Sequence, residues 1–188
     1  MIKLKSLICT CICTSALLAI SFTIKAQKKF SIEKGEINFA SRAQLELIKA
    51  SSDKVQGLID PATHQFAFTV EVRSFRGFNS ELQREHFNEK YLESEKYPRA
   101  RFSGKIIEHI DFTPGNTFEV RAKGDLEIHG QKQTRIIKSK VVVNDGQLLI
   151  ESLFTVPLAD HNISIPSIVS QKIATEIEVD FKATMKLQ

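Results

Sequence analysis

The sequence predicts an all-β protein, an antiparallel sheet of about eight strands with one short helix. Two observations lead to this prediction. From Phe30 onward, apolar and polar residues alternate in steps of two, as they do in half-buried strands. Only residues 74–104 break the alternation at length, and there the spacing is helical for Leu82, His86, Phe87 and Tyr91.

Residues 1–26 are expected to be a signal peptide. Lys3 and Lys5 precede an uncharged apolar run at 7–24, and Ala26 before Gln27 is a suitable cleavage point. A membrane anchor is the alternative, but Cys, Thr and Ser dilute the run. We therefore expect a periplasmic or secreted protein, one domain over residues 27–188, with no stable membrane insertion after cleavage.

Charge and cysteine content describe the exported part. All three cysteines lie in the signal, so residues 27–188 contain no disulfide. The signal also carries three lysines and no acid, which leaves 23 basic and 22 acidic residues and a net charge of +1. This balance gives no electrostatic reason to expect a nucleic-acid partner.

The first half of the exported chain reads as short strands. Ile37 and Phe39 are expected on one inner face, and Leu45 and Leu47 on the inner face of the next strand. Asp60-Pro61 marks a turn. The strand after this turn places four apolar residues on one side, Phe66, Phe68, Val70 and Val72.

The segment between the two halves is predicted to be a helix over about residues 80–92. Ser80 is a good N-cap, Glu81 suits the first turn, and Pro98 prevents further helix. A helical excursion of this kind between two strands can cover the open end of a barrel.

The second half alternates more regularly. Its first strand directs one set of residues inward: Phe118, Val120, Ala122, Gly124, Leu126 and Ile128. Asn144-Asp145-Gly146 then predicts a tight hairpin, and residues 173–185 form a last strand long enough to pair with the first. Alternation alone fits a two-sheet sandwich as well as a closed barrel.

Small residues on the inner faces allow two interpretations. Gly104, Ala122, Gly124 and Ala183 either leave room for a ligand or relieve crowding where strands bend. The residues alone favour the second interpretation.

Two ordered motifs carry a family resemblance. The first contains Tyr97, Pro98, Phe102 and Gly104; the second contains Gly124, Leu126, Ile128, His129, Gly130 and Lys132. Together they resemble the YceI-like family of exported lipid-binding proteins, over roughly residue 30 to the C-terminus. The resemblance implies a lipocalin-like β-barrel with an apolar tunnel for a polyisoprenoid, an isoprenoid quinone or a fatty amide. Pairing into a homodimer is compatible with it. The chain departs from the family at residues 35–41, where a His-Ser pair is usual.

If the tunnel exists, we expect two sets of residues to bind the ligand. The lumen and lid would use Phe39, Phe66, Phe68, Val70, Phe87, Tyr91, Phe102, Phe118, Val120, Leu126, Phe154 and Phe181. A polar head group would meet Arg73, Arg76, Arg84, His86 and His129, because guanidinium and imidazole groups suit phosphate and other polar heads.

Two other function classes remain open. A hydrolase is the first, but the five histidines lack metal-ligand spacing and no Gly-x-Ser-x-Gly motif is present. The second is a non-enzymatic envelope module whose barrel is filled by its own twelve exported phenylalanines. We expect no cofactor other than a bound lipid, no catalytic residue and no metal.

Overall fold

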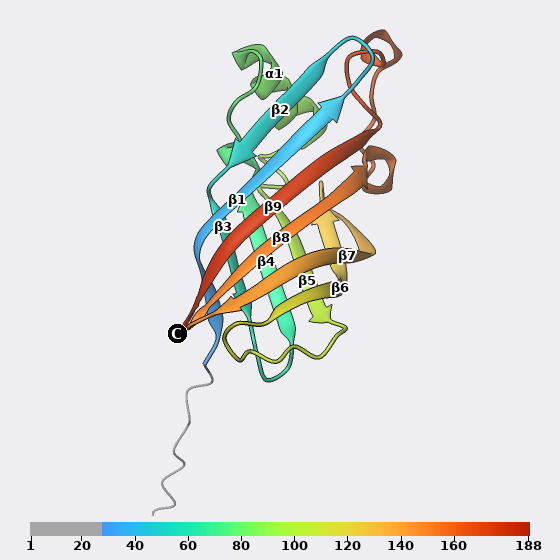
Figure 1. Cartoon of the computed structure of the whole chain (residues 1–188). Coiled ribbons are helices and arrows are strands. Elements are labelled where there is room, and N and C mark those ends of the chain that lie inside the picture. Colours follow the sequence, from blue (N-terminus) through green and yellow to red (C-terminus); the bar gives the residue numbers. More distant parts are fainter. Residues whose placement is uncertain (1–27) are drawn as a thin grey trace, which may run out of the picture.

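A computed structural model describes residues 28–188 and shows one antiparallel sheet (Figure 1). The predicted signal peptide lies outside the described residues. The strands are β1 Phe30–Arg42, β2 Leu47–Ser52, β3 Val55–Ile59, β4 Gln65–Glu71, β5 Arg99–Ile106, β6 Thr117–Ile128, β7 Gln131–Asn144, β8 Gln147–Pro157 and β9 Glu176–Leu187.

The sheet closes into a barrel, as predicted. Strands β3 to β9 pair in chain order, and both β3 and β9 pair with β1, which makes eight strands in the ring. The ninth strand, β2, pairs with β1 on the same side as β3. Ile37 of β1 lies opposite Ser52 of β2, and Ser31 of β1 lies opposite Leu58 of β3, so both pairings have the same register and β2 continues the line of β3. Closure leaves few strand edges free to pair with another chain, chiefly where β7 and β8 part.

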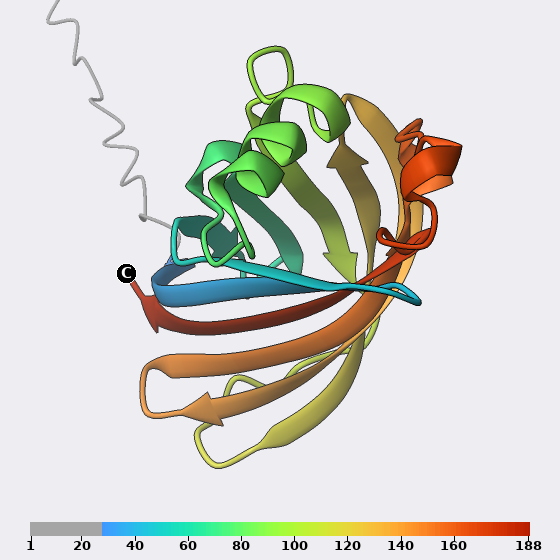
Figure 2. The same cartoon turned by 90° about the horizontal axis from the view of Figure 1, so that it is seen from above.

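One end of the barrel carries the helical segments (Figure 2). After β4 the chain forms η1 Val72–Ser74, α1 Glu81–His86 and a π-helical turn, η2 Phe87–Tyr91. The β8–β9 connection adds η3 Leu158–His161 and η4 Ser167–Val169. These segments and the β1–β2 loop lie at the same end, so three connections surround the opening of the barrel.

The opposite end is filled by side chains. Phe30, Ile59, Phe66 and Ile106 are buried there with Ile110, which belongs to the β5–β6 loop. Phe112 of the same loop stacks on Phe30, with ring centroids 5.5 Å apart. This packing supports the lower end of the barrel and leaves the helical end as the natural opening.

Strands β7 and β8 diverge toward the helical end. Only Lys140–Asn144 of β7 pairs with Gln147–Glu151 of β8, and η3 bridges the gap between the remaining parts of the two strands. Arg135 of β7 forms an ion pair with Asp160, and the buried hydroxyls of Ser139 and Ser152 are hydrogen-bonded at 2.6 Å where the strands part. The divergence widens the barrel beneath its cover.

The prediction for Leu45 and Leu47 is wrong. Both side chains are exposed, and β2 turns Ile48 and Ala50 inward instead. The pairing with β1 decides this, because residues opposite each other in an antiparallel ladder share a face and Ala50 lies opposite Phe39.

The two facing glycines allow two strands to approach closely. Gly104 and Gly124 are paired across β5 and β6. A Cβ on Gly124 would lie 2.2 Å from the carbonyl oxygen of Ser103, and one on Gly104 would lie 2.1 Å from that of Lys123. For this pair the interpretation as relief of crowding is therefore the right one, whereas Ala122 does line the barrel interior.

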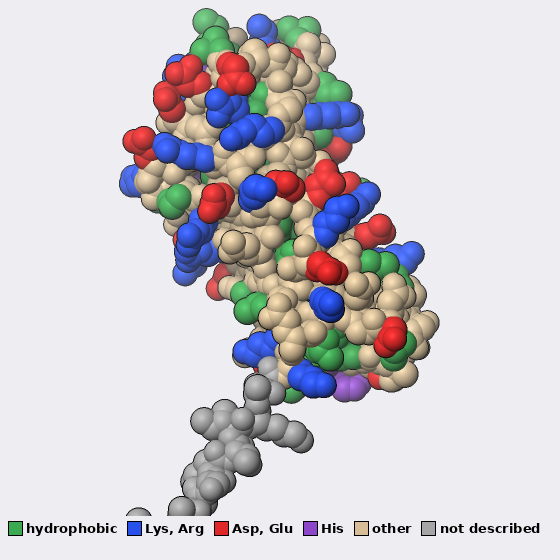
Figure 3. Space-filling model, turned by 90° about the vertical axis from the view of Figure 1, so that its left-hand side faces the viewer, with side chains coloured by type: hydrophobic (Ala, Val, Ile, Leu, Met, Phe, Trp, Pro, Cys, Tyr) green, Lys and Arg blue, Asp and Glu red, His purple; other side chains and the backbone are tan. Residues whose placement is uncertain are grey.

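The outer surface is polar and mixed in charge. On the face shown in Figure 3, basic and acidic side chains are interspersed rather than gathered by sign. Within residues 28–188, no helix has the length and apolar content needed to cross a bilayer.

Candidate functional site

An apolar cavity of about 350 Å³ lies beneath the helical cover. We call it the upper cavity. Its walls come from β1, from residues 72–92 and from the β8–β9 connection. Its apolar lining includes Ile37, Phe39, Ile48, Val72, Phe75, Phe78, Phe87, Leu158, Ile163, Val169, Ile173 and Ile177.

A second cavity of about 140 Å³ lies deeper in the barrel. We call it the lower cavity. Its lining is almost wholly apolar and includes Phe66, Phe68, Phe102, Val120, Ala122, Leu126, Ile137, Val141, Ile150, Phe154 and Phe181. The hydroxyls of Ser139 and Ser152 also reach it but bond to each other. A lining of this kind offers a ligand contact and no directional chemistry.

The two cavities share a boundary. Six residues line both: Ile37, Val70, Ala100, Ile128, Val156 and Val179. Ala100 is the smallest of them and lies opposite Val70 in the β4–β5 ladder. The cavities therefore follow one another along the barrel axis, in the arrangement that an extended chain requires.

An aromatic cluster forms the wall of the upper cavity next to the helix. Phe39 of β1 stacks on Phe87 of the helix, with centroids 5.4 Å apart, and lies 5.4 Å from Phe75 and 5.9 Å from Phe78. Each such pair adds about 0.5–1.5 kcal/mol beyond area burial. This cluster is what holds the helix against the barrel.

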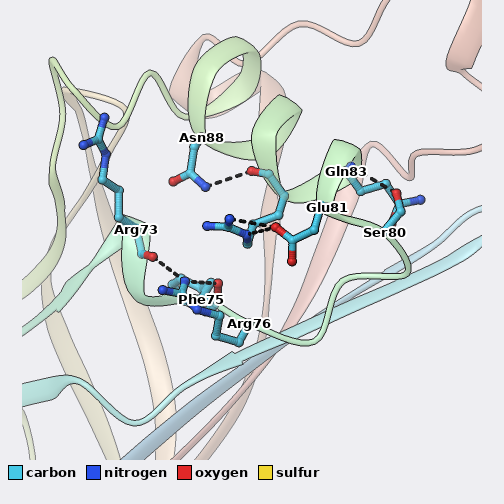
Figure 4. Close-up of polar contacts among 8 residues, drawn as sticks. Arg73, Phe75, Arg76, Ser80, Glu81, Gln83 and Asn88 are labelled. Carbon is cyan, nitrogen blue, oxygen red and sulfur yellow. Dashed lines mark hydrogen bonds and ion pairs between the residues drawn. The ribbon is translucent and has the colours of Figure 1, made fainter.

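Polar contacts fix where the helix begins. The Ser80 hydroxyl accepts a hydrogen bond from the Gln83 backbone N–H at 3.2 Å, which confirms the predicted cap (Figure 4). The Gln83 side chain in turn donates to Glu46 at 2.5 Å, and Asn79 donates to the same carboxylate. The β1–β2 loop is thereby tied to the start of α1.

A small set of polar groups lines the upper cavity near its opening: Ser41, Glu46, Gln83, His86, Tyr91 and Lys172. Burial raises the pKa of the Tyr91 phenol. Its hydroxyl therefore stays protonated and able to donate a hydrogen bond. Apolar walls with a few polar groups at one end are the usual arrangement for an amphipathic ligand.

Eleven of the twelve predicted lumen and lid residues line one or both cavities. Phe39, Phe87 and Tyr91 line the upper one, Val70 lines both, and the other seven line the lower one. Phe118 does not line either cavity and packs against the core at the closed end.

Of the five predicted head-group residues, the structure brings only His86 to the cavity. Arg73 donates to Ser94 and Glu95. Arg76 donates to the backbone carbonyls of Arg73 and Phe75, and Arg84 donates to Glu81 (Figure 4). These contacts hold the three guanidinium groups on partners outside the upper cavity.

His129 holds the two sequence motifs together. Its Nδ1 donates to the His161 carbonyl at 3.1 Å, and its Nε2 lies 2.6 Å from the Glu93 carboxylate. The Tyr97 ring packs edge-on against it at 4.9 Å and leaves no room for a Cβ at Gly130. His129 therefore serves as a brace beside the barrel opening.

Sequence reasoning missed the contribution of the β8–β9 connection. Leu158, Ile163, Val169, Lys172 and Ile173 all line the upper cavity. Ile173 was expected to begin the last strand, which starts instead at Glu176; the other four lie in a segment without strand or helix periodicity, so no pattern singled them out. The apolar residues spaced through a Ser-rich and Pro-containing loop were the available signal.

No group of His, Cys, Asp and Glu that could hold a metal ion occurs in residues 28–188. The buried His161 has its Nδ1 bonded to the Gln131 carbonyl at 3.1 Å. Burial lowers the pKa of His161, and Arg135 lowers it further, while the Gln131 and Ile128 carbonyls and Asp160 oppose the shift. This histidine is a packed, neutral group at the end of η3.

The geometry agrees with the comparison to known families. The family model for the YceI-like domain matches residues 19–185. The chain belongs to the YceI-like family. No curated protein sequence matches it significantly.

Solved structures show the same YceI-like fold at low sequence identity. The polyisoprenoid binding domain from Saccharophagus degradans is 15% identical, with a TM-score of 0.71 over 85% of this chain and 98% of its own. BcnA from Burkholderia cenocepacia is 18% identical, with a TM-score of 0.66 over 80% and 95%. The YCEI protein of Campylobacter jejuni is 15% identical, with a TM-score of 0.59 over 76% and 86%.

Proposed function

We propose that this protein binds one long apolar chain in the barrel and carries or stores it in the cell envelope. The observation that carries the proposal is that the upper and lower cavities adjoin along the barrel and share six lining residues. A barrel filled by its own phenylalanines would have neither cavity, so the cavities argue against the solid envelope module.

The ligand class follows from the lining and from the neighbours. A polyisoprenoid, an isoprenoid quinone or a fatty amide has an apolar chain for the two cavities and a polar end for the groups at the opening. The binding domain from Saccharophagus degradans is described as polyisoprenoid binding, which supports the first of these. Burying about 400 Å² of apolar surface gives roughly 10 kcal/mol before association costs.

The proposed role is non-enzymatic. The polar groups of the upper cavity include no nucleophile activated by an adjacent base, and the buried Ser139 and Ser152 bond to each other. A hydrolase acting on a lipid-like substrate would need such a pair. Incubation with ester and phosphate substrates is therefore expected to release no product.

The site of action is proposed to be outside the cytoplasm. The support is the pattern of residues 1–26, with two lysines, an uncharged apolar run and Ala26 before Gln27. Cell fractionation followed by N-terminal sequencing should find the protein in the periplasm or medium, beginning near Gln27.

The decisive experiment is organic extraction of protein purified without detergent, followed by mass spectrometry. We expect a long-chain lipid at close to one molecule per barrel. An extract without a stoichiometric lipid, together with no uptake of added polyprenol, would refute the proposal. The matched control is Phe118→Leu, which changes a predicted residue outside both cavities and should retain the lipid.

A further inference from the structure

Exposed leucine and isoleucine side chains lie beside the opening of the upper cavity. Leu45 and Leu47, at the β1–β2 loop, are 64% and 42% exposed, and Ile168 of η4 is 89% exposed. We call these three residues the apolar rim. Each is adjacent in sequence to a residue that lines the upper cavity, namely Glu46, Ile48 and Val169. The segments that line the upper cavity therefore also carry exposed apolar side chains.

The rim is one surface, although its residues are far apart in sequence. The Leu45 backbone N–H donates to the Gln171 carbonyl at 2.9 Å, which joins the β1–β2 loop to the β8–β9 connection. Scattered exposed leucines are ordinary on a soluble protein, but a joined pair of loops at a cavity opening is a different arrangement.

The β8–β9 side of the rim carries positive charge. Residues 162–175 contain one base, Lys172, and no acid. Lys172 is exposed, lines the cavity and forms no ion pair with any residue from 28 to 188. The nearby carboxylates are engaged, Glu46 with Gln83 and Asn79, and Glu178 with Arg42.

The helix side of the opening differs. There the exposed residues include Glu85 and Glu89, which form no ion pair within residues 28–188 and share one helical face with Glu81, the partner of Arg84. An anionic surface would be repelled by this face and attracted by Lys172. Any contact with such a surface is therefore made by the loop side.

We propose that the apolar rim and Lys172 dock on a membrane that contains anionic phospholipid. The rim side chains would enter the interface while Lys172 meets a phosphate head group. A lipid could then pass between bilayer and cavity without exposure to water. This inference rests on the proposed lipid-binding function and adds the surface from which the lipid comes.

A second copy of the chain suits the rim less well. Stable interfaces bury about 800 Å² on each partner, and three aliphatic side chains supply a few hundred at most. A membrane accepts a patch of this size, because insertion of a few side chains together with charge attraction is enough for reversible binding.

Vesicle flotation tests the proposal. The purified protein is mixed with phosphatidylcholine vesicles, with or without phosphatidylglycerol. We expect the wild type to float with the anionic vesicles, and the double variant L45S/I168S to bind about tenfold more weakly or less. Lys172→Gln should lose the preference for phosphatidylglycerol and keep the weaker binding to phosphatidylcholine.

The matched control is L58S/L153S. It removes two leucines of the barrel wall that are 47% and 74% exposed, and it should bind vesicles like the wild type. Circular dichroism of each variant confirms folding. No flotation of the wild type, or equal loss in both double variants, would overturn the proposal. A rim variant that turns a dimer into a monomer in sedimentation, with vesicle binding unchanged, would overturn it as well.

Uptake of polyprenol from dilute ethanol, without vesicles, separates this proposal from the proposed function. Protein that takes up polyprenol from ethanol but does not float refutes docking alone. Protein that floats through its rim but takes up no polyprenol refutes lipid carriage and leaves docking supported.

Discussion

Replacing Gly124 by Ala should destabilise the barrel by more than the addition of one methyl group usually does. The new Cβ would lie 2.2 Å from the Ser103 carbonyl oxygen and 3.0 Å from the Gly104 Cα, and both atoms are backbone. Ordinary contact begins near 3.2–3.4 Å, so β5 must move by about 1 Å, which lengthens the neighbouring ladder hydrogen bonds to near 4 Å. Two such bonds contribute about 1 kcal/mol each, and distorted packing adds to this.

Alanine also lowers the conformational entropy of the unfolded chain, which offsets about 0.4–1 kcal/mol of this destabilisation. The expected net loss is about 2–3 kcal/mol, or a fall in Tm of roughly 4–12 °C for a domain of this size. Urea unfolding followed by circular dichroism measures it. Gly35→Ala is the control, since its Cβ would meet Ile32 Cγ2 and Val55 Cβ at 3.2 Å, a much smaller overlap than that at Gly124. If both variants lose the same small amount, the close approach of β5 and β6 does not constrain the fold.

Three further predictions concern the tunnel, pH and the helix. Ala100→Phe should block the boundary between the cavities, weakening a long polyprenol about tenfold or more and a short one little, as measured by Kd. Because burial lowers the pKa of His161, unfolding free energy should fall as pH drops below about 6.5, where the unfolded chain binds the proton first. His161→Gln should flatten this dependence between pH 7.5 and 5.5; an unchanged slope would contradict it. Ser80→Ala should cost about 1 kcal/mol in urea unfolding, whereas Ser164→Ala, at an exposed loop position outside any helix cap, should cost little.

The fold could be predicted because burial on one face leaves a strong pattern. In β6, the inward residues from Phe118 to Ile128 and the polar ones between them follow the sequence alternation closely. The helix could be predicted for a similar reason, since Ser80 as the N-cap and Pro98 as a helix breaker affect only the few residues next to them. Both kinds of signal are local, so a single sequence contains them.

The phase of β2 could not be predicted. Leu47 and Ile48 are adjacent and both apolar, so either could start the inward set. Pairing with β1 places Ile48 opposite Ser41, and this register turns Ile48 inward. This information lies in the partner strand and is absent from the local pattern.

The head-group residues were uncertain for a related reason. The sequence shows which side chains are basic but does not show which groups they contact in the fold. Arg84 is three residues after Glu81 on a helix, so its ion pair could have been expected. The contacts of Arg73 with Ser94 and Glu95 depend on how two separate turns meet. Lys172 was missed because no periodic element contains it.

The two family motifs owe their spacing to the barrel wall. Strands β5 and β6 pair Phe102 with Leu126 and Gly104 with Gly124, and Tyr97 packs on His129 and Gly130 just above. Three of the four positions in the first motif thus lie against the second, and the separation between the motifs is set by the end of β5, the β5–β6 loop and the first half of β6. Most of these contacts fix strand pairing and the brace at the opening. The polar groups at the cavity opening, Glu46, Gln83 and Lys172, lie outside both motifs. Exchanging these three residues should therefore change which lipid is held while the barrel and its motifs stay intact.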